Sequence, residues 1–394
     1  MSFTVLSLVC LVALLGPLLA LDERRQVPVV VGELAAGLVL GQSGVGYLDA
    51  TDPTFAFLAA IGFALVMFVA GTHVPVGRLD GADLRSASLS VVLVGVAAVV
   101  LGFALAAVVG TGHGALYAVL VASSSAALVL PVVDSLGLQG PAVTRLVAQV
   151  AIADTVCIVA VPLVVDPADV GRATLGTVLV LGVGFLVWFV FRHLDRIGVR
   201  RRVHDLSERR RFALELRINL VVLFALAALA THVHVSVMLA GFVFGLAVAA
   251  IGEPRRLARQ LFALADGFFA PLFFVWFGAS LDVRALGEYP DMALLGVALG
   301  VAAVLAHLVA RVAGQPLAGG LLSSAQLGVP VAAATVGAQL GVLRPGEGPA
   351  LLVGALVTVA AAALGGSFLA RDDSLTRDES TGPTSGPTGV GGPG

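Results

Sequence analysis

The chain of 394 residues is a succession of long apolar segments separated by short polar ones. A helix needs about 20 apolar residues to cross the roughly 30 Å hydrocarbon core of a bilayer. The pattern therefore predicts an all-α integral membrane protein with about thirteen transmembrane helices, near residues 2–21, 27–44, 54–73, 86–110, 114–134, 143–165, 173–192, 213–231, 234–251, 262–280, 291–313, 316–340 and 348–370.

The basic residues predict how these helices are oriented. If the N-terminus is outside, the loops after odd-numbered helices are cytoplasmic and hold most of the arginines, namely Arg24, Arg25, Arg78, Arg85, Arg145, those between Arg192 and Arg217, Arg255, Arg256, Arg259, Arg311, Arg371 and Arg377. The outer loops then hold Arg172, Arg284 and Arg344. Cytoplasmic loops carry the excess of positive charge in membrane proteins. We therefore expect an N-out/C-in topology.

Composition narrows the possible functions. The chain is 58% hydrophobic and 12% charged, which excludes an ordinary soluble domain. The net charge of -2 indicates no nucleic-acid partner. The sequence lacks the metalloprotease, serine-hydrolase and phosphate-loop motifs, so we expect neither an enzyme nor a cofactor. The cysteines Cys10 and Cys157 lie in separate apolar segments and predict no disulfide or metal site.

Two polar stretches organise the rest of the chain. The basic loop from Arg192 to Arg211 is expected to separate two halves and to contact anionic lipid. Residues 371–394 are rich in Ser, Thr, Gly and Pro and predict a disordered cytoplasmic tail. Residues 1–370 are then the membrane module.

A faint internal repeat links two of the predicted helices. Leu120–Pro131 and Leu321–Pro330 each place small polar residues before a proline, and the predicted topology runs the two helices in opposite directions. Inverted-repeat transporters have broken helices of this kind that cross at the bilayer midplane. Small residues also serve simple close packing, so the repeat alone does not decide between the two.

Asp154 is the main candidate for chemistry. It lies nine residues after Arg145, or about 13.5 Å at 1.5 Å per residue, which places it near the middle of its span. An ionisable group at that depth is costly and is a functional candidate by default. Its carboxylate can bind a proton or a cation in competition. The structural alternative is a neutral aspartic acid that links helices.

Further polar groups lie within the predicted spans. Ser123 and Ser124 offer oxygens where their helix breaks, or bond back to the preceding turn. His307 lies four residues before Arg311, on the same helix face, and is either a titrating group or a packing histidine. Arg311 is near the cytoplasmic end and can extend to water. Glu33 is a secondary candidate that lines a vestibule or bonds helix ends.

Several motifs together resemble the monovalent cation:proton antiporter superfamily, in particular its second branch of glutathione-gated potassium efflux and bacterial sodium/proton antiporters. The similar stretches are Pro28–Gly41, Ile61–Gly71, Ser123–Ser125, Asp154 and Phe269–Asp282. The resemblance covers nearly the whole membrane module. It implies an inverted-repeat antiporter fold, with core elements near 86–165 and 291–370, dimerisation or scaffold elements near 2–73 and 213–280, and a linker helix near 173–192.

The chain departs from the family pattern at positions that matter for charge. Ala153 stands where relatives have the first acidic or amide residue of a pair, and His307 stands where they have a lysine or arginine, with Arg311 as an alternative match. Changing both partners together is physically coherent, because removing one would leave a buried unpaired charge. Gln326–Val329 likewise lacks the glutamate of the family stretch.

The resemblance implies a secondary transporter that exchanges Na⁺ or K⁺ for protons around Asp154, with Ser123 and Ser124 helping to remove water from the ion. We expect a multi-pass protein and a homodimer in a bacterial plasma membrane. The alternatives are a sodium-coupled carrier of an organic anion and a sensor or channel-like relic that does not transport. The retained Asp154 disfavours the relic.

Overall fold

The computed structural model describes residues 1–20, 29–72, 74, 81–165, 170–198, 213–233, 235–252 and 255–371. Every regular element among these residues is a helix. Within the described part of the chain, nine helical segments are long and apolar enough to cross a membrane: Pro53–Thr72, Gly81–Val109, Pro141–Val165, Val170–Arg196, Leu214–His232, Gln260–Ser280, Pro290–Ala313, Leu317–Leu340 and Glu347–Leu369. Shorter apolar helical segments are Phe3–Leu18, Val29–Leu40, Gly114–Leu130 and Val237–Ile251. Each predicted segment overlaps one of these.

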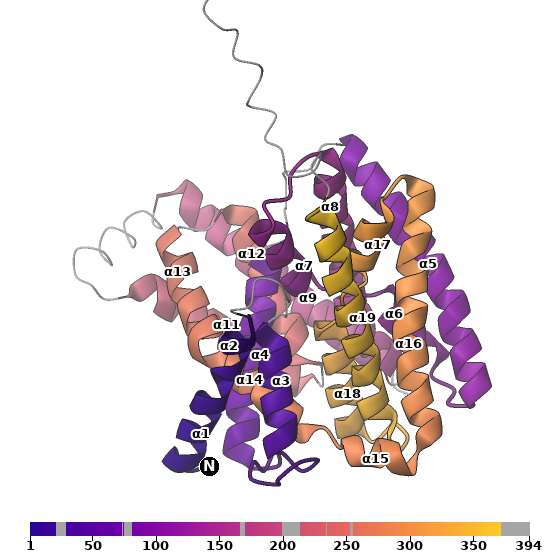
Figure 1. The fold of residues 1–394 in the computed structure, drawn as a ribbon. Coiled ribbons are helices and arrows are strands. Elements are labelled where there is room, and N and C mark those ends of the chain that lie inside the picture. The colour runs from indigo at the N-terminus through magenta and orange to yellow at the C-terminus, as the bar shows by residue number, and fades with distance from the viewer. Residues whose placement is uncertain are drawn as a thin grey trace, which may run out of the picture.

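The helices form two packed groups (Figure 1). The first group comprises α1 (Phe3–Ala13), α2 (Leu15–Ala20), α3 (Val29–Leu40), α4 (Pro53–Thr72), α11 (Leu214–His232), α12 (Val237–Ile251), α13 (Arg255–Leu264), the π-helical turn η2 (Ala265–Phe269) and α14 (Ala270–Ser280). The second group comprises α5 (Gly81–Val109), α6 (Gly114–Ala122), α7 (Ala126–Ser135), α8 (Pro141–Val165), α16 (Pro290–Leu308), the 3-10 turn η3 (Val309–Ala313), α17 (Leu317–Ser323), α18 (Gly328–Leu340) and α19 (Glu347–Leu369).

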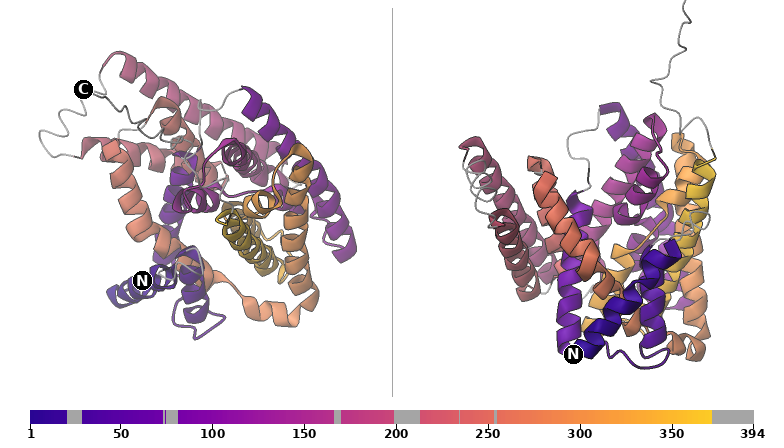
Figure 2. Two further views of the ribbon diagram at one scale, coloured as in Figure 1. Left: turned by 45° about the horizontal axis from the view of Figure 1, so that its top comes forward. Right: turned by 60° about the vertical axis from the view of Figure 1, so that its left-hand side comes forward.

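Two remaining helices connect the groups. α9 (Val170–Arg196) packs against α12 of the first group and α8 of the second. The short α15 (Val283–Glu288) lies at the lower end in Figure 1, on the path from α14 to α16. The views in Figure 2 show the two groups as neighbouring bundles.

Glycine allows the close approach of α4 and α12 in the first group. A Cβ at Gly241 would overlap the carbonyl oxygen of Ala64, and a Cβ at Gly245 would overlap that of Phe68. Small residues four apart let helix backbones pack directly in a membrane, where dispersion replaces the hydrophobic effect between helices. This spacing fixes α12 against α4.

The start of α4 is set by an aspartate in the preceding loop. Asp52 Oδ1 accepts hydrogen bonds from the backbone N–H groups of Thr54 (2.9 Å) and Phe55 (3.0 Å), which satisfies orphan donors of the first helical turn. Its Oδ2 accepts from the Met1 ammonium at 2.5 Å. The ammonium first, and then the Phe55 amide, hold the pKa of Asp52 below its usual value.

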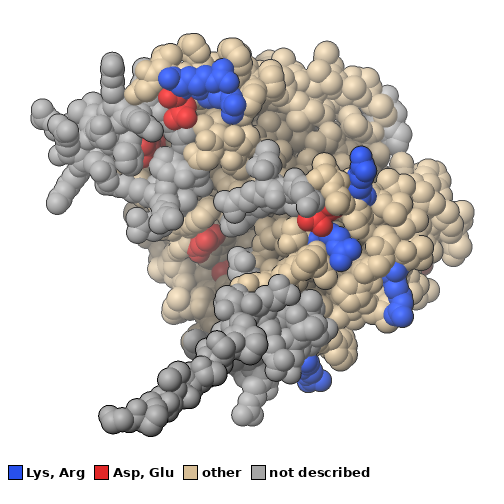
Figure 3. Space-filling view, turned by 90° about the horizontal axis from the view of Figure 1, so that it is seen from above, with Lys and Arg blue, Asp and Glu red and all other residues tan. Residues whose placement is uncertain are grey.

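Parts of the sequence predictions lie outside the described residues. These parts are Arg24, Arg25, Arg78, most of the basic loop and nearly all of the tail. Figure 3 looks onto the end of the molecule that the sequence predicts to be cytoplasmic, and several arginines lie on it.

Candidate functional site

The two helices of the predicted repeat are both broken. The first changes from α6 to α7 over Ser123–Ser125, where Ser123 has an extended backbone (φ -72°, ψ 146°). The three serines are 0–3% exposed. The second changes from α17 to α18 over Ser324–Leu327. Both breaks precede the proline of their segment, since Pro131 lies within α7 and Pro330 is the third residue of α18.

The breaks hold each other through reciprocal hydrogen bonds. The Ser124 hydroxyl donates to the carbonyl oxygen of Ser323, the last residue of α17, over 2.7 Å. The Gln326 side-chain amide donates to the carbonyl oxygen of Leu120, in the last turn of α6, over 2.6 Å. Carbonyls at a helix end have no partner within the helix. Each break therefore supplies a donor to the half-helix that ends in the other.

Asp154 lies beside the first break. It is in the middle of α8 and is 4% exposed. Its Oδ2 accepts a hydrogen bond of 2.9 Å from the backbone N–H of Ala126, the first residue of α7. The N-terminus of a helix carries partial positive charge, which favours an anion there. The carboxylate is thus placed against the positive end of a half-helix, with Ala153 buried next to it.

His307 joins the same group from α16. Its ring is fully buried, Nδ1 is 2.8 Å from the carbonyl oxygen of Ala303, and Nε2 is 3.2 Å from the Ser124 hydroxyl. A carbonyl only accepts, so Nδ1 carries a hydrogen. The single hydroxyl hydrogen of Ser124 can go to Ser323 or to Nε2. All three hydrogen bonds form together when Nε2 is also protonated, which links the charge of His307 to the crossing.

The structure separates Arg311 from His307. Arg311 is exposed, whereas His307 is not. The helix tightens at Val309 into η3, and a 3-10 helix turns 120° per residue instead of 100°. This tighter turn increases the angle between the two side chains around the helix axis.

Glu33 also lies apart from the crossing. It is 3% exposed in α3, and its Cγ is close to the position that a Cβ on Gly16 of α2 would occupy. The other side of α3, with Val31 and Ala35, lines a pocket of about 160 Å³ together with residues of α7, α18 and α19. Glu33 thus points away from the second helix group.

Three further residues complete the site: Ser123, and Gln326 and Thr358, which were not among the site residues predicted from the sequence. The Ser123 hydroxyl donates to Leu120 in its own helix at 2.8 Å, as the structural alternative predicted. The Gln326 backbone N–H donates to the Thr358 hydroxyl of α19 at 3.2 Å. Gln326 could have been suspected because an amide within an apolar span needs a partner. Thr358 carried no signal, because a threonine in a helix usually bonds its own backbone.

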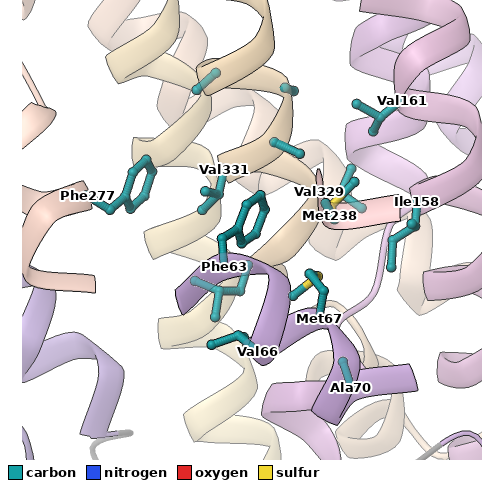
Figure 4. Packing of buried hydrophobic residues seen from close by; sticks show 14 of the residues in the cluster. Phe63, Val66, Met67, Ala70, Ile158, Val161, Met238, Phe277, Val329 and Val331 are labelled. Atoms are coloured by element: carbon teal, nitrogen blue, oxygen red, sulfur yellow. The ribbon is translucent and has the colours of Figure 1, made fainter. Parts of the chain in front are cut away.

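A cavity of about 410 Å³ lies between the two helix groups, toward the predicted outer end. Its polar lining comes from Thr231, Ser236, Thr335 and Gln339. Phe63, which lines this cavity, and Met67 of α4 belong to one buried apolar cluster with Ile158 of α8 and Val329 of α18 (Figure 4). We call these four residues the apolar layer. Ile158 is one turn beyond Asp154 on α8, on the side toward the predicted outer end.

Comparison with known proteins agrees with this architecture. Residues 10–371 match the family described as "Sodium/hydrogen exchanger, transmembrane". The chain is 25% identical over 385 residues to the putative Na⁺/H⁺ antiporter YjbQ of Bacillus subtilis, covering 90% of this chain and 61% of that protein. It is 25% identical over 340 residues to the probable Na⁺/H⁺ antiporter 3 of Methanocaldococcus jannaschii, covering 82% of this chain and 85% of the relative. The chain therefore spans less than two thirds of the Bacillus relative's length.

The fold matches that of a solved transporter. The sodium proton antiporter MjNhaP1 from Methanocaldococcus jannaschii at pH 8 superposes with a TM-score of 0.65 at 17% identity, covering 94% of this chain and 98% of that one. A second structure of MjNhaP1 gives a TM-score of 0.70 at 16% identity. The crossing of two broken helices and the match over nearly the whole membrane module lead to one conclusion: the chain belongs to the sodium/hydrogen exchanger family of the monovalent cation:proton antiporter superfamily.

Proposed function

We propose that this protein is a secondary active transporter that exchanges Na⁺ or K⁺ for protons by alternating access around Asp154. The observation that carries the proposal is the buried Asp154 carboxylate at the N-terminus of a broken helix. One carboxylate can hold a proton or an alkali cation, and the two compete for it. The names of the relatives, which are Na⁺/H⁺ antiporters, support Na⁺ as the cation.

The neighbouring groups have proposed roles in ion binding. The oxygens of Ser123 and Ser124 replace part of the hydration shell of the cation, because hard cations prefer oxygen ligands. His307 is a charge-compensating or proton-binding group, since it contacts Ser124 directly. Arg311, which is exposed, is the alternative charge-compensating group, and Glu33, which is buried, is a secondary candidate.

The proposed arrangement in the bilayer has thirteen crossings, with the N-terminus outside. The second helix group is the moving core, the first is the scaffold through which a homodimer forms, and α9 links them. Packing within each group supports this division. The bacterial relative and the apolar helices support a plasma-membrane location.

Alternating access requires that Asp154 meets one side of the membrane at a time. In the proposed mechanism, the apolar layer separates the carboxylate from the outer cavity. A sliding or rocking movement of the core against α4 would part Ile158 and Val329 from Phe63 and Met67. The cavity would then extend to Asp154 and give it access to the outside.

A single carboxylate at the site implies a stoichiometry of one cation per proton. Ala153 carries no charge, so one cation replaces one proton and the exchange is electroneutral. If His307 released a second proton in each cycle, the exchange would move net charge.

The test uses purified protein in liposomes that contain a pH dye. Pulses of Na⁺, K⁺ and Li⁺ are applied to the wild type, to Asp154→Asn and to the matched control Asp291→Asn, an exposed aspartate at the start of α16. We expect proton movement in the wild type and the control, and none in Asp154→Asn. Absence of any response in the wild type at about pH 6 to 9 would refute the exchange and favour the organic-anion or sensor alternative.

A further inference from the structure

A second buried polar cluster lies at the predicted outer end of the core. Its centre is Glu347, the first residue of α19, which is 0% exposed. Glu347 Oε1 accepts a hydrogen bond from the Tyr117 hydroxyl over 2.6 Å and is 2.6 Å from His113 Nδ1. Its Oε2 accepts from the backbone N–H of Arg344 at 2.8 Å. The Arg344 guanidinium donates to the carbonyl of Gly110.

This cluster joins the outer ends of both crossing helices. His113 directly precedes α6, the outer half of the first broken helix. Glu347 follows the short loop after α18, the outer half of the second. The two broken helices are therefore tied twice, once at their breaks through Ser124 and Gln326, and once at their outer ends through Glu347.

Within the cluster, the His113 side chain reaches the surface and can respond to the outer solution. It is 15% exposed, whereas Tyr117 and Glu347 are fully buried. Histidine is the side chain whose charge ordinarily changes between about pH 5 and 8. Arg344 keeps its charge throughout this range.

The neighbouring elements add few other charges. The outer end of α5 carries no ionisable side chain over Leu101–Val109. Glu288 ends α15, and Tyr289 and Asp291 lie at the start of α16, all exposed. Their exposure to water screens them from the buried carboxylate.

Protonation of His113 changes the strength of its bond to Glu347. A neutral imidazole donates a hydrogen bond to the carboxylate, whereas an imidazolium adds the attraction of opposite charges to that hydrogen bond. A buried carboxylate also needs positive charge nearby. The tie between the helix ends is therefore strongest when the outer solution is acidic enough to protonate His113.

We propose that His113 and Glu347 form a clamp that responds to external pH and positions α6 for cation binding. This inference rests on the proposed exchange. α6 has nine residues between His113 and Ser123, so it transmits a shift of its outer end to the first break. The protonated clamp holds Ser124 on Ser323 and Ala126 on Asp154, as in this structure, and the neutral clamp lets them loosen.

The test measures the apparent KM for external Na⁺ in liposomes of uniform protein orientation, with internal pH fixed. Replacing His113 by glutamine leaves a neutral donor. We expect His113→Gln to raise KM about fivefold at about pH 6, the low end of typical couplings between sites, and to leave it nearly unchanged at about pH 8.5. The matched control is His232→Gln, an exposed histidine at the end of α11.

A double-mutant cycle tests whether the two residues act together. Glu347→Gln removes the charge that His113 meets, so adding His113→Gln to it should change KM no further at about pH 6. The clamp would be overturned if the KM increases of the two single variants multiplied in the double variant. It would also be overturned if His113→Gln changed KM by the same factor at both pH values, because His113 would then have a purely structural role.

A second measurement does not depend on transport. Hydrogen exchange of the α6 amides, corrected for the intrinsic effect of pH, should slow on acidification in the wild type but not in His113→Gln. If the protection of the α6 amides in the wild type does not change with pH, the clamp is refuted, even if the protein exchanges cations for protons. A wild type that shows the protection change but no cation-driven proton movement would refute the proposed function instead.

Discussion

The backbone N–H of Ala126 donates a hydrogen bond of 2.9 Å to the carboxylate of Asp154. The two residues belong to different helices, and the bond satisfies the backbone N–H of the first residue of α7. Asp154 thus has two tasks, since it completes the broken helix and presents a carboxylate to an ion. Substitutions can separate these tasks.

The first prediction concerns stability at this position. Asp154→Asn keeps an acceptor for Ala126 and should unfold at nearly the wild-type temperature, although it does not exchange. Asp154→Ala leaves the buried N–H without a partner and should lower stability by about 1–3 kcal/mol. Thermal unfolding in detergent measures both variants, with Asp291→Ala as the control. Equal unfolding temperatures for the Asn and Ala variants would show that the bond does not support the fold.

The second prediction separates hydroxyls within the two breaks. Ser124 donates across the crossing to Ser323, whereas Ser324 donates within its own turn to Leu321 over 2.7 Å. Ser124→Ala should slow exchange and destabilise the protein by about 1 kcal/mol or more, because it frees a buried carbonyl. Ser324→Ala should change the exchange rate and the stability much less. Ser124→Thr, which keeps the hydroxyl, should behave like the wild type. Similar losses for the two alanine variants would contradict the importance of the crossing bond.

The third prediction concerns charge movement. Exchange of one cation for one proton at Asp154 should not depend on an imposed membrane potential, because no net charge crosses. The measurement compares initial rates in liposomes with and without a potassium-valinomycin potential, using Na⁺ as the cation. A rate that depends on potential in the wild type but not in His307→Gln would assign the second proton to His307.

The fourth prediction uses a native cysteine to probe the apolar layer. Cys157 is buried, is next to Ile158, and lies one turn from Asp154. In a Cys10→Ser background, an impermeant thiol reagent added outside should label it slowly. Met67→Ala removes packing worth about 2–5 kcal/mol and should speed labelling at least about tenfold. The control is Met292→Ala, which truncates a buried methionine outside the layer. Equal acceleration by both variants would mean general loosening instead of an opened layer.

The sequence alone determined where the helices lie along the chain and that they are of the membrane-spanning kind. Apolar segments of membrane-spanning length have few alternatives to a helix, because every backbone polar group must be satisfied inside the bilayer. The breaks at Ser123–Ser125 and Ser324–Leu327 could also be predicted, since small polar residues precede a proline in both segments. Asp154 stood out because a charge at that depth is rarely tolerated without a reason.

Only the tertiary structure decided which groups meet. His307 was a candidate, but its contact with Ser124 joins residues 183 positions apart, and a local 3-10 turn changes its angle to Arg311. Glu347 and His113 lie at helix ends, where a sequence predicts exposure, yet packing buries the glutamate among three donors. Periodicity specifies the face of a helix, whereas the partner of that face depends on how helices distant in sequence pack together.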